Sequence, residues 1–200
     1  MDSLPLRENF IAKVILGEDY EEVKVASKSV QKQTRSGQKT RHKAVVVIGN
    51  GAGVLGIGVS TAKDHPAAVA QAAAQARTNI IPVRLGYFGE AKNEKSVHTL
   101  PFNVTGKSGS VRVRLIPAPM GRGIVANKTC GDILKLAGIT NCFVVSKGHT
   151  SSRENHAKAT FDALKKTYSF YPPQDWDNQN YHRSLADEAV ILNLKQMTIG

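Results

Sequence analysis

Three runs in the first half of the chain either alternate apolar and polar residues or are dense in β-branched residues. Alternation with a period of two is typical of a strand with one buried face. We therefore predict strands over residues 23–30, 43–48 and 54–61. An Asn50-Gly51 pair lies between the second and third runs. It predicts a type I′ hairpin turn, whose two central positions both need positive φ.

An alanine-rich stretch over residues 67–79 follows the third run. Alanine is the best helix former. Asp64 followed by Pro66 is a typical helix start, because a capping side chain can accept backbone N–H groups and a first-turn proline gives up no helical hydrogen bond. Small side chains on one face of this helix favour close packing on the sheet. The first unit is therefore predicted to be β-β-β-α, with two layers.

A second set of elements occupies the rest of the chain. The tetrapeptide Gly106–Gly109 separates two apolar runs, as in a hairpin. Thr129 is placed to cap a helix that Gly138 ends in the left-handed conformation, and Ser151 with Glu154 matches a capping box. The predicted elements are strands over 100–105, 110–116 and 139–146, and helices over 130–137 and after residue 151. The second unit is thus β-β-α-β-α.

These units and the breaker-rich stretches around them predict an α+β chain of two small two-layer domains. The predicted organisation is an N-terminal segment (1–22), a first domain (23–85), a linker (86–98), a second domain (99–170) and a C-terminal tail (171–200).

The charge changes this picture by pointing to an acidic partner. The formal net charge is +11, which is most often associated with nucleic acid or an anionic membrane surface. Residues 28–166 hold 22 Lys and Arg against six Asp and Glu, whereas both ends are mildly acidic. No apolar run is long enough for a transmembrane helix, and the N-terminus lacks the pattern of a secretory signal. We expect neither a membrane partner nor a homo-oligomer.

Side chains that could carry metal or catalytic chemistry are few and scattered. The two cysteines, Cys130 and Cys142, match no zinc spacing and are interpreted as reduced, buried residues. The histidines have no acid or cysteine at a useful spacing, and no serine lies on a recognisable nucleophile turn. We therefore expect no enzyme activity, no metal and no cofactor.

One motif supports an enzyme hypothesis. Gly51, Gly53 and Gly56 match the spacing of the dinucleotide fingerprint and follow a predicted strand. That fingerprint needs a helix that starts within the motif, so that the helix N-terminus meets the pyrophosphate. Here the chain continues as an alternating strand. Glycines that serve a tight hairpin and a close approach of sheet to helix explain the same residues.

The stretch from Gln31 to Lys43 is cationic and contains no acid. We interpret it as a loop that faces water or a polyanion. Its amide and hydroxyl side chains suit phosphate and sugar contacts, and Gly37 permits a close approach of the backbone. Loop-borne cations without a basic recognition helix favour folded RNA over DNA. The predicted RNA contacts are Gln31, Lys32, Gln33, Thr34, Arg35, Ser36, Gly37, Gln38, Lys39, Thr40, Arg41, Lys43, Asn50, Gly51, Arg84, Lys107, Arg112, Arg114 and Arg122.

Several long stretches resemble a known family. They are the run that begins VQKQTRSGQKTRHKAVVVIGNGAGVLGIG, then SVRVRLIPAPMGRGIVA, LKLAGITNCF and KATFDALKKTYSF. In order, over about residues 9–176, they resemble the small-subunit ribosomal proteins numbered five in the universal scheme and two in the older eukaryotic one. QKQTR, RLGYFG and TYSF resemble the eukaryotic and archaeal branch. Arg122 stands where that family usually has Thr.

The resemblance implies a first domain like a double-stranded-RNA-binding module and a second domain with a left-handed βαβ crossover. It implies a cytosolic ribosome location near the neck, the mRNA entry path and the decoding region, with nucleolar assembly in a eukaryote. The implied partners are small-subunit rRNA, neighbouring ribosomal proteins and mRNA at the entry channel. The family's loop between the first two strands matches Gln31 to Arg41 and would reach into rRNA.

Three hypotheses of different classes follow. The first is a structural rRNA-binding constituent of the small ribosomal subunit that supports assembly and translational fidelity without catalysis. The second is an extraribosomal RNA-binding or chaperone module that uses the same surface. The third is a dinucleotide-dependent enzyme.

Overall fold

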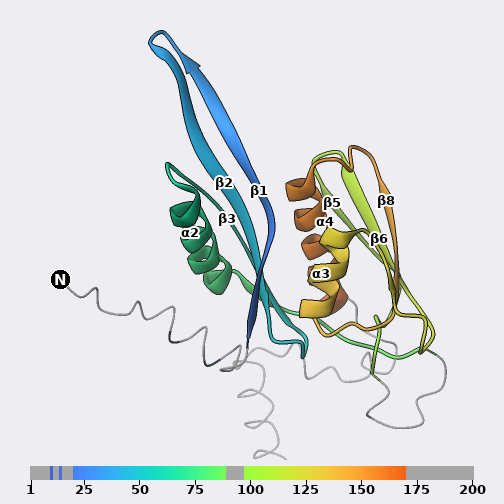
Figure 1. The fold of residues 1–200 in the computed structure, drawn as a ribbon. Helices are drawn as coiled ribbons and strands as arrows, with labels where there is room; N and C mark the ends of the chain where they lie inside the picture. Colours follow the sequence, from blue (N-terminus) through green and yellow to red (C-terminus); the bar gives the residue numbers. More distant parts are fainter. Residues whose placement is uncertain (1–9, 11–13, 15–19, 89–96, 170–200) are drawn as a thin grey trace, which may run out of the picture. The chain divides into compact units, whose positions relative to one another are not determined.

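A computed structural model of the chain describes residues 20–88 and 97–169, together with Phe10 and Val14. The predicted C-terminal tail, almost all of the N-terminal segment and the middle of the predicted linker lie outside the described residues. The described part forms two sheets with helices packed against them (Figure 1).

The first sheet has four antiparallel strands in the order β1-β2-β3-β4. Its elements are β1 (Glu21–Thr34), β2 (Gly37–Gly49), β3 (Val54–Ala62), α2 (His65–Thr78) and β4 (Ile80–Pro82). The predicted β-β-β-α order is present, and β4 adds a fourth strand beside β3.

The interpretation of residues 31–43 as a loop is wrong, because these residues form the far end of a long hairpin. β1 continues to Thr34, β2 begins at Gly37, and the turn between them is only Arg35 and Ser36. The strands pair residue by residue along this length. The physical reason is that an antiparallel ladder satisfies the backbone groups without any apolar side chain, so the missing hydrophobic alternation did not indicate a loop.

The connection between β2 and β3 is also different from the predicted type I′ turn. Among the described residues no residue other than glycine has positive φ, so Asn50 cannot occupy the first central position of that turn. Instead the Asn50 side chain folds over the connection. Its Oδ1 accepts hydrogen bonds from the backbone N–H groups of Ala52 at 2.9 Å and Val54 at 3.1 Å. An Asn side chain commonly replaces a backbone turn in this way.

Helix α2 confirms the predicted helix, with Pro66 in its first turn, and packs closely on the sheet. The Asp64 carboxylate makes no capping hydrogen bond; the backbone oxygen of Asp64 accepts from Ala68 N instead. A Cβ added to Gly58 in β3 would lie 2.0 Å from the backbone oxygen of Ala72. Only glycine fits there, as the close sheet–helix approach predicted.

The second sheet has the order β5-β6-β8-β7. Its elements are β5 (Val104–Ser108), β6 (Val111–Pro117), β7 (Ile124–Val125), α3 (Lys128–Leu136), β8 (Cys142–Lys147), α4 (Arg153–Lys165) and the short 3-10 helix η2 (Lys166–Tyr168). β7 and β8 are parallel with α3 between them, which is a βαβ crossover. The short strand β7 was not predicted.

Several local predictions for the second half need correction. Most of the predicted turn Gly106–Gly109 is strand, and the hairpin turns at Gly109 and Ser110 instead. Asn127, not Thr129, is the N-cap of α3. The predicted capping box is absent: Ser152 is the N-cap of α4 and makes no side-chain capping bond. Because the helix begins at Arg153, Glu154 is its second residue instead of its third, and the Glu154 carboxylate pairs with lysines.

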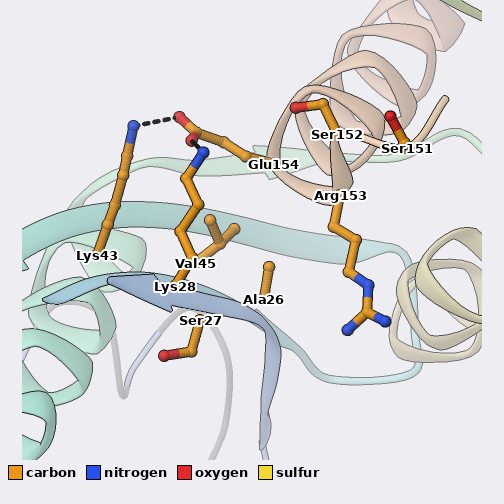
Figure 2. Close-up of a pocket in the computed structure, with 9 residues that line it drawn as sticks. All are labelled: Ala26, Ser27, Lys28, Lys43, Val45, Ser151, Ser152, Arg153 and Glu154. Atoms are coloured by element: carbon orange, nitrogen blue, oxygen red, sulfur yellow. Dashed lines mark ion pairs between the residues drawn. The ribbon is translucent and has the colours of Figure 1, made fainter. Parts of the chain in front are cut away.

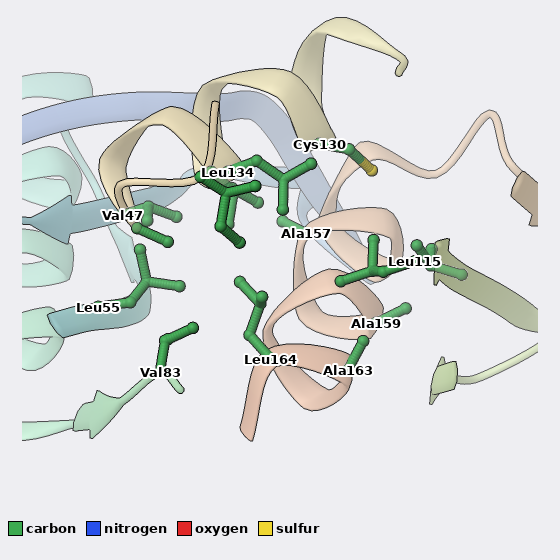
Figure 3. Close-up of a cluster of buried hydrophobic side chains, with 14 of the residues drawn as sticks. Val47, Leu55, Val83, Leu115, Cys130, Leu134, Ala157, Ala159, Ala163 and Leu164 are labelled. Atoms are coloured by element: carbon green, nitrogen blue, oxygen red, sulfur yellow. The ribbon is translucent and has the colours of Figure 1, made fainter. Parts of the chain in front are cut away.

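Two clusters of buried side chains hold these layers together. The smaller one lies between β2 and α2 and consists largely of alanines with Val46 and Ile48. The larger one joins Val47 and Leu55 of the first sheet to Leu134 and Leu164 of α3 and α4, and continues to β5 and β6 (Figure 3). The two halves of the described chain therefore share one core, with α3 and α4 between the sheets. Cys130 and Cys142 are buried in it.

Candidate nucleic-acid interface

The most exposed regular structure in the described chain is the far end of the β1–β2 hairpin. We call residues 28–43 the outer hairpin. β3 pairs with β2 only from His42 onward, so beyond that point the two strands have no third strand beside them. Figure 1 shows this ribbon projecting past the end of β3 and past α2. Its side chains are exposed or half-buried throughout.

Strand register sorts the outer hairpin into two chemically different faces. Directly opposite residues of an antiparallel pair point to the same face, and neighbours along a strand point to opposite faces. Lys28 is opposite Lys43, Val30 is opposite Arg41 and Lys32 is opposite Lys39. These positions are two residues apart, so they lie on one face. The basic face consists of Lys28, Lys32, Lys39, Arg41 and Lys43.

The polar face carries the amides and hydroxyls. Ser29 is opposite His42, Gln31 is opposite Thr40 and Gln33 is opposite Gln38. Gln31 Nε2 donates a hydrogen bond to Thr40 Oγ1 at 3.2 Å. The sequence suggested interleaved cations and amides around one loop, whereas the structure separates them. The signal that could have predicted this separation is the even spacing of the cations within each strand: Lys28 and Lys32 on β1, and Lys39, Arg41 and Lys43 on β2.

The outer part of the basic face repels itself. Lys32 and Lys39 face each other directly, an arrangement that destabilises an isolated sheet. No described acid pairs with these two lysines, with Arg41 or with Arg35 at the turn. Thr34 Oγ1 donates to Gly37 O at 2.7 Å and Gly37 has φ +117°, so the turn itself is fixed by local bonds. A polyanion bound here would remove the repulsion.

The inner end of the basic face is paired with one acid on the other half of the molecule. Glu154 of α4 forms ion pairs with Lys43 at 2.6 Å and with Lys28 at 3.9 Å (Figure 2). It also pairs with Lys158, one helical turn along α4, at 2.8 Å. Burial would raise the pKa of Glu154, but hydrogen bonds from Lys158 and Lys43 outweigh it, and the pKa falls below its ordinary value. Glu154 therefore stays charged and ties the hairpin to α4.

A pocket of about 250 Å³ lies beside this ion-pair cluster. Figure 2 shows Ser151, Ser152 and Arg153 of the α4 start on one side and the β1–β2 strands on the other. The pocket is lined by both halves, and Glu154 already occupies the lysines nearest to it. We therefore interpret the pocket as part of the junction between the hairpin and α4, not as a separate binding site.

Asn50 and Gly51 do not join the outer hairpin. They follow the opposite end of β2, about 40 Å along an extended strand from Gly37. Gly51 N–H donates to Leu136 O at 2.9 Å, and Gly53 N–H donates to Ala137 O at 3.1 Å. The glycine turn thus docks on the end of α3. The amides that a pyrophosphate would need are already bonded, and Gly56 lies in β3, so the dinucleotide geometry is absent.

Most of the remaining predicted contacts lie on the second half, and Arg84 lies at the end of the first. Lys107, Arg112 and Arg114 are exposed on the side of the second sheet away from the helices. Arg122 lies with its guanidinium 5.5 Å from the centre of the Phe143 ring. Arg84 is half-buried just after β4, and its backbone N–H donates to Thr167 Oγ1 at 3.0 Å. None of these residues belongs to the outer hairpin.

Other chemistry-bearing side chains serve the core. His156 is 1% exposed, hydrogen-bonds Ser146 Oγ at 2.8 Å, and burial lowers its pKa. Burial raises the pKa of the Cys142 thiol to about 11. Within residues 20–88 and 97–169 no group of His, Cys, Asp and Glu could hold a metal ion. Across the same described part, every helix is too short or too polar to span a membrane.

Comparison with known proteins adds an independent line of argument. The sequence model for the N-terminal domain of ribosomal protein S5 matches residues 20–84, and the model for the C-terminal domain of ribosomal protein S5 matches residues 106–178. A protein from Candida albicans described as small ribosomal subunit protein uS5 is 47% identical over 176 residues. That alignment covers 88% of this chain and 70% of the relative.

Proposed function

The chain belongs to the ribosomal protein S5 family, and from that premise we propose that it is a non-catalytic structural constituent of the small ribosomal subunit that binds rRNA through the outer hairpin. The cell compartment that goes with this function is the cytoplasm, on the ribosome. Its partners are rRNA and neighbouring ribosomal proteins. The observation that carries the proposal is the outer part of the basic face, where Lys32, Lys39 and Arg41 have no acidic partner among the described residues and no third strand lies beside the ribbon.

The proposed mechanism is electrostatic fixation of the rRNA backbone. Lysine and arginine neutralise phosphates and release condensed counterions, which gives affinity without sequence readout. Arg35 and Arg41 can hold a phosphate with two hydrogen bonds, whereas Lys32 and Lys39 act as point charges. The polar face offers amides and hydroxyls to sugars and phosphates of the same or an adjacent strand. Glu154 sets the direction of the ribbon by holding its base to α4.

The finer placement rests on the family resemblance. We propose that the outer hairpin meets rRNA near the neck and decoding region, close to the mRNA entry path, and that fixing rRNA there supports subunit assembly and accurate tRNA selection. In a eukaryotic cell, assembly would begin in the nucleolus. Asn50, Gly51 and Arg84 remain predicted RNA contacts, but they lie away from the outer hairpin and would bind RNA separately from it.

The test compares two faces of one ribbon in the full-length tagged chain. A basic-face variant carries Lys32→Gln, Arg35→Gln, Lys39→Gln and Arg41→Gln. A polar-face variant carries Gln31→Ala, Gln33→Ala and Gln38→Ala. After sedimentation through a high-salt gradient, we expect the wild type with small subunits, and also most of the polar-face variant, because it loses neutral contacts but keeps every cation. The basic-face variant should remain largely in the soluble fraction, and cells that depend on it should misread codons more often. Normal assembly and fidelity of the basic-face variant would remove the outer hairpin from the mechanism.

The alternative function, an extraribosomal RNA-binding module, would use the same surface. The same gradient distinguishes the two hypotheses. A wild-type chain found only outside ribosomal particles, yet binding unrelated duplex RNA with a steep salt dependence, would favour that alternative.

A further inference from the structure

The turn at the tip of the outer hairpin carries an exposed hydroxyl group. Arg35 and Ser36 form this turn, and both side chains are exposed. The Ser36 hydroxyl lies 3.3 Å from Thr34 Oγ1, its one hydrogen-bond partner among the described residues. Thr34 itself is half-buried and already bonded to the backbone of the turn at 2.7 Å, and Thr40 lies within β2. Ser36 is therefore the tip hydroxyl most accessible to another protein.

The residues on both sides of Ser36 are basic. Arg35 precedes it directly, Lys32 lies four residues before it and Lys39 three residues after it, and the stretch from Gln31 to Lys43 contains no acid. Serine/threonine kinases select their acceptors partly by the charge pattern of the flanking residues. A kinase whose substrate groove is lined by acids would form charge-assisted hydrogen bonds with these cations. The surroundings of Ser36 thus fit a basic-directed kinase and repel an acid-directed one.

The outer hairpin also suits the extended form that a kinase groove requires. β3 pairs with β2 only from His42 onward, so the ribbon that carries the turn has two strands and projects past the rest of the first sheet (Figure 1). An isolated two-stranded ribbon is marginally stable. Lys32 directly opposite Lys39 weakens its pairing further. The strands beside Ser36 can therefore open at little cost.

Ser110 at the β5–β6 turn is a contrasting case within the chain. It is exposed and lies between Lys107 and Arg112, so its flanking charge is similar. However, Arg112 pairs with β8 as well as with β5, and Gly148 packs directly against the backbone oxygen of Ser110. The four-stranded sheet therefore holds this turn in place. Flanking charge alone does not distinguish the two serines, whereas the free two-stranded ribbon does.

We propose that Ser36 is a phosphorylation site for a basic-directed serine/threonine kinase, and that the phosphate prevents the outer hairpin from binding RNA. The second part rests on the proposed rRNA-binding function. In the transfer, Ser36 Oγ attacks the γ-phosphorus of ATP and forms a new O–P bond. The bond between that phosphorus and the leaving oxygen of ADP breaks, and the hydroxyl proton passes to a base of the kinase.

The added phosphate lies among the cations that RNA would bind. A phosphoserine carries about −1.5 to −2 charges at pH 7 and accepts strong hydrogen bonds from arginine. Arg35 is the adjacent residue in the turn. The Lys32–Lys39 pair lies two residues down the ladder from the end of the strands, about 7 Å away. Pairing within the hairpin therefore occupies about two of the tip cations and relieves the repulsion between the two lysines.

Labelling of the free full-length protein tests the site. The reagents are ATP and the catalytic domain of protein kinase C, which accepts basic residues on both sides of its acceptor. We expect one phosphate per chain, located at Ser36 by mass spectrometry. Ser36→Ala should abolish the labelling, Ser36→Thr should retain it, and the matched control Ser110→Ala should be labelled as the wild type is. A free chain that is not labelled, or is labelled mainly at another residue, would overturn the proposal.

The effect on RNA is measured on protein in which phosphoserine is incorporated at Ser36 during translation, so that it depends on no kinase. The log–log salt slope for duplex RNA should fall by about 2, the value for two lost phosphate contacts. The matched control carries phosphoserine at Ser169, which is exposed after η2 and separated from the hairpin junction by the 13 residues of α4, about 20 Å. This control should keep the wild-type slope. An unchanged slope with phosphoserine at Ser36 would overturn the switch.

The outcomes distinguish this inference from the proposed function. RNA that binds the outer hairpin covers the turn, so duplex RNA bound beforehand should suppress labelling of Ser36. If RNA leaves the labelling unchanged and the basic-face variant keeps the wild-type salt slope, the proposed function fails together with the switch, whereas the phosphorylation site stands. If the basic-face variant loses slope and phosphoserine at Ser36 does not, the proposed function stands and the switch fails.

Discussion

Strands β1 and β2 form one long hairpin, yet its two ends differ in burial and in charge. At the inner end, Ala44 to Ile48 of β2 are at most 2% exposed, because α2 covers one side and the shared core covers the other. At the outer end, the same strands have no covering layer and carry cations on one face and amides on the other. One ladder of backbone hydrogen bonds thus joins a region that holds the fold to a region available to a ligand.

This difference shows that the residues that stabilise the fold and the residues available to a ligand occupy different ends of the same hairpin. Side chains at the inner end contribute by burial, which is proportional to apolar area. Side chains at the outer end contribute little to folding and, at Lys32 opposite Lys39, oppose it. Substitutions at the two ends should therefore move different measurements.

Amide hydrogen exchange should show the largest contrast between the two ends. In the free protein, the amides of residues 44–48 should exchange only on global unfolding, which for a domain costs about 5–15 kcal/mol. The amides of residues 31–40 should exchange with little protection, because an isolated two-stranded ribbon is marginally stable. Added RNA should slow the outer amides selectively. Equal protection at both ends of the free protein would break the comparison.

Ile48→Ala should produce the next largest effect. Ile48 is fully buried between β2 and α2, and the truncation leaves a cavity, so we expect a loss of about 2–5 kcal/mol of unfolding free energy in urea titrations. RNA affinity of the folded protein should not change. The control is Val30→Ala, which truncates a half-buried side chain on the outer hairpin and should cost no more than about 1 kcal/mol. Equal costs would mean that the outer hairpin is packed as tightly as the core.

Glu154→Gln tests the junction between the two ends. Its side chain is 11% exposed and its single negative charge pairs with both Lys43 and Lys158, so we expect a loss of about 1–3 kcal/mol at neutral pH. Because the folded-state pKa of Glu154 is lowered, this stabilisation is present above the ordinary glutamate pKa of about 4.3 and is lost as the pH falls through the folded-state value. Urea titrations should show wild type and variant converging on acidification.

The matched control for that variant is Glu22→Gln, which removes a partly exposed carboxylate paired with the single cation Arg77. Its cost should stay within about 1 kcal/mol. A difference between wild type and Glu154→Gln that persists in acid would contradict the electrostatic role.

Lys39→Gln should give the smallest change, and with opposite signs in two assays. Removing the charge opposite Lys32 should stabilise the hairpin by a few tenths of a kcal/mol, up to about 1 kcal/mol. The log–log salt slope of RNA binding should fall by about 0.9, the value for one lost phosphate contact. Gln38→Glu lowers the net charge equally on the polar face and should leave the slope unchanged. A slope that responds to both variants alike would show that only net charge matters.

Local sequence signals predicted much of the fold. The β-branched run at residues 44–48, the alanine-rich helix with Pro66, and Gly138 at the end of α3 all lie where neighbouring residues alone decide the conformation. The family resemblance, carried by long ordered motifs, is confirmed by the two domain matches. The loop prediction failed where the backbone ladder outweighed the lack of apolar side chains.

The sequence by itself determined the inventory of this protein: which segments are extended or helical, where the chain can turn, and that its middle is strongly basic without acids near residues 31–43. Only the tertiary structure decided which cations stand together. Lys32 meets Lys39 through the hairpin register, Lys147 joins Arg112 through a pairing of distant strands, and Glu154 reaches Lys43 across the shared core. The physical reason is that conformation follows largely from local backbone preferences, whereas the neighbours of a charge follow from register and packing between segments far apart in sequence.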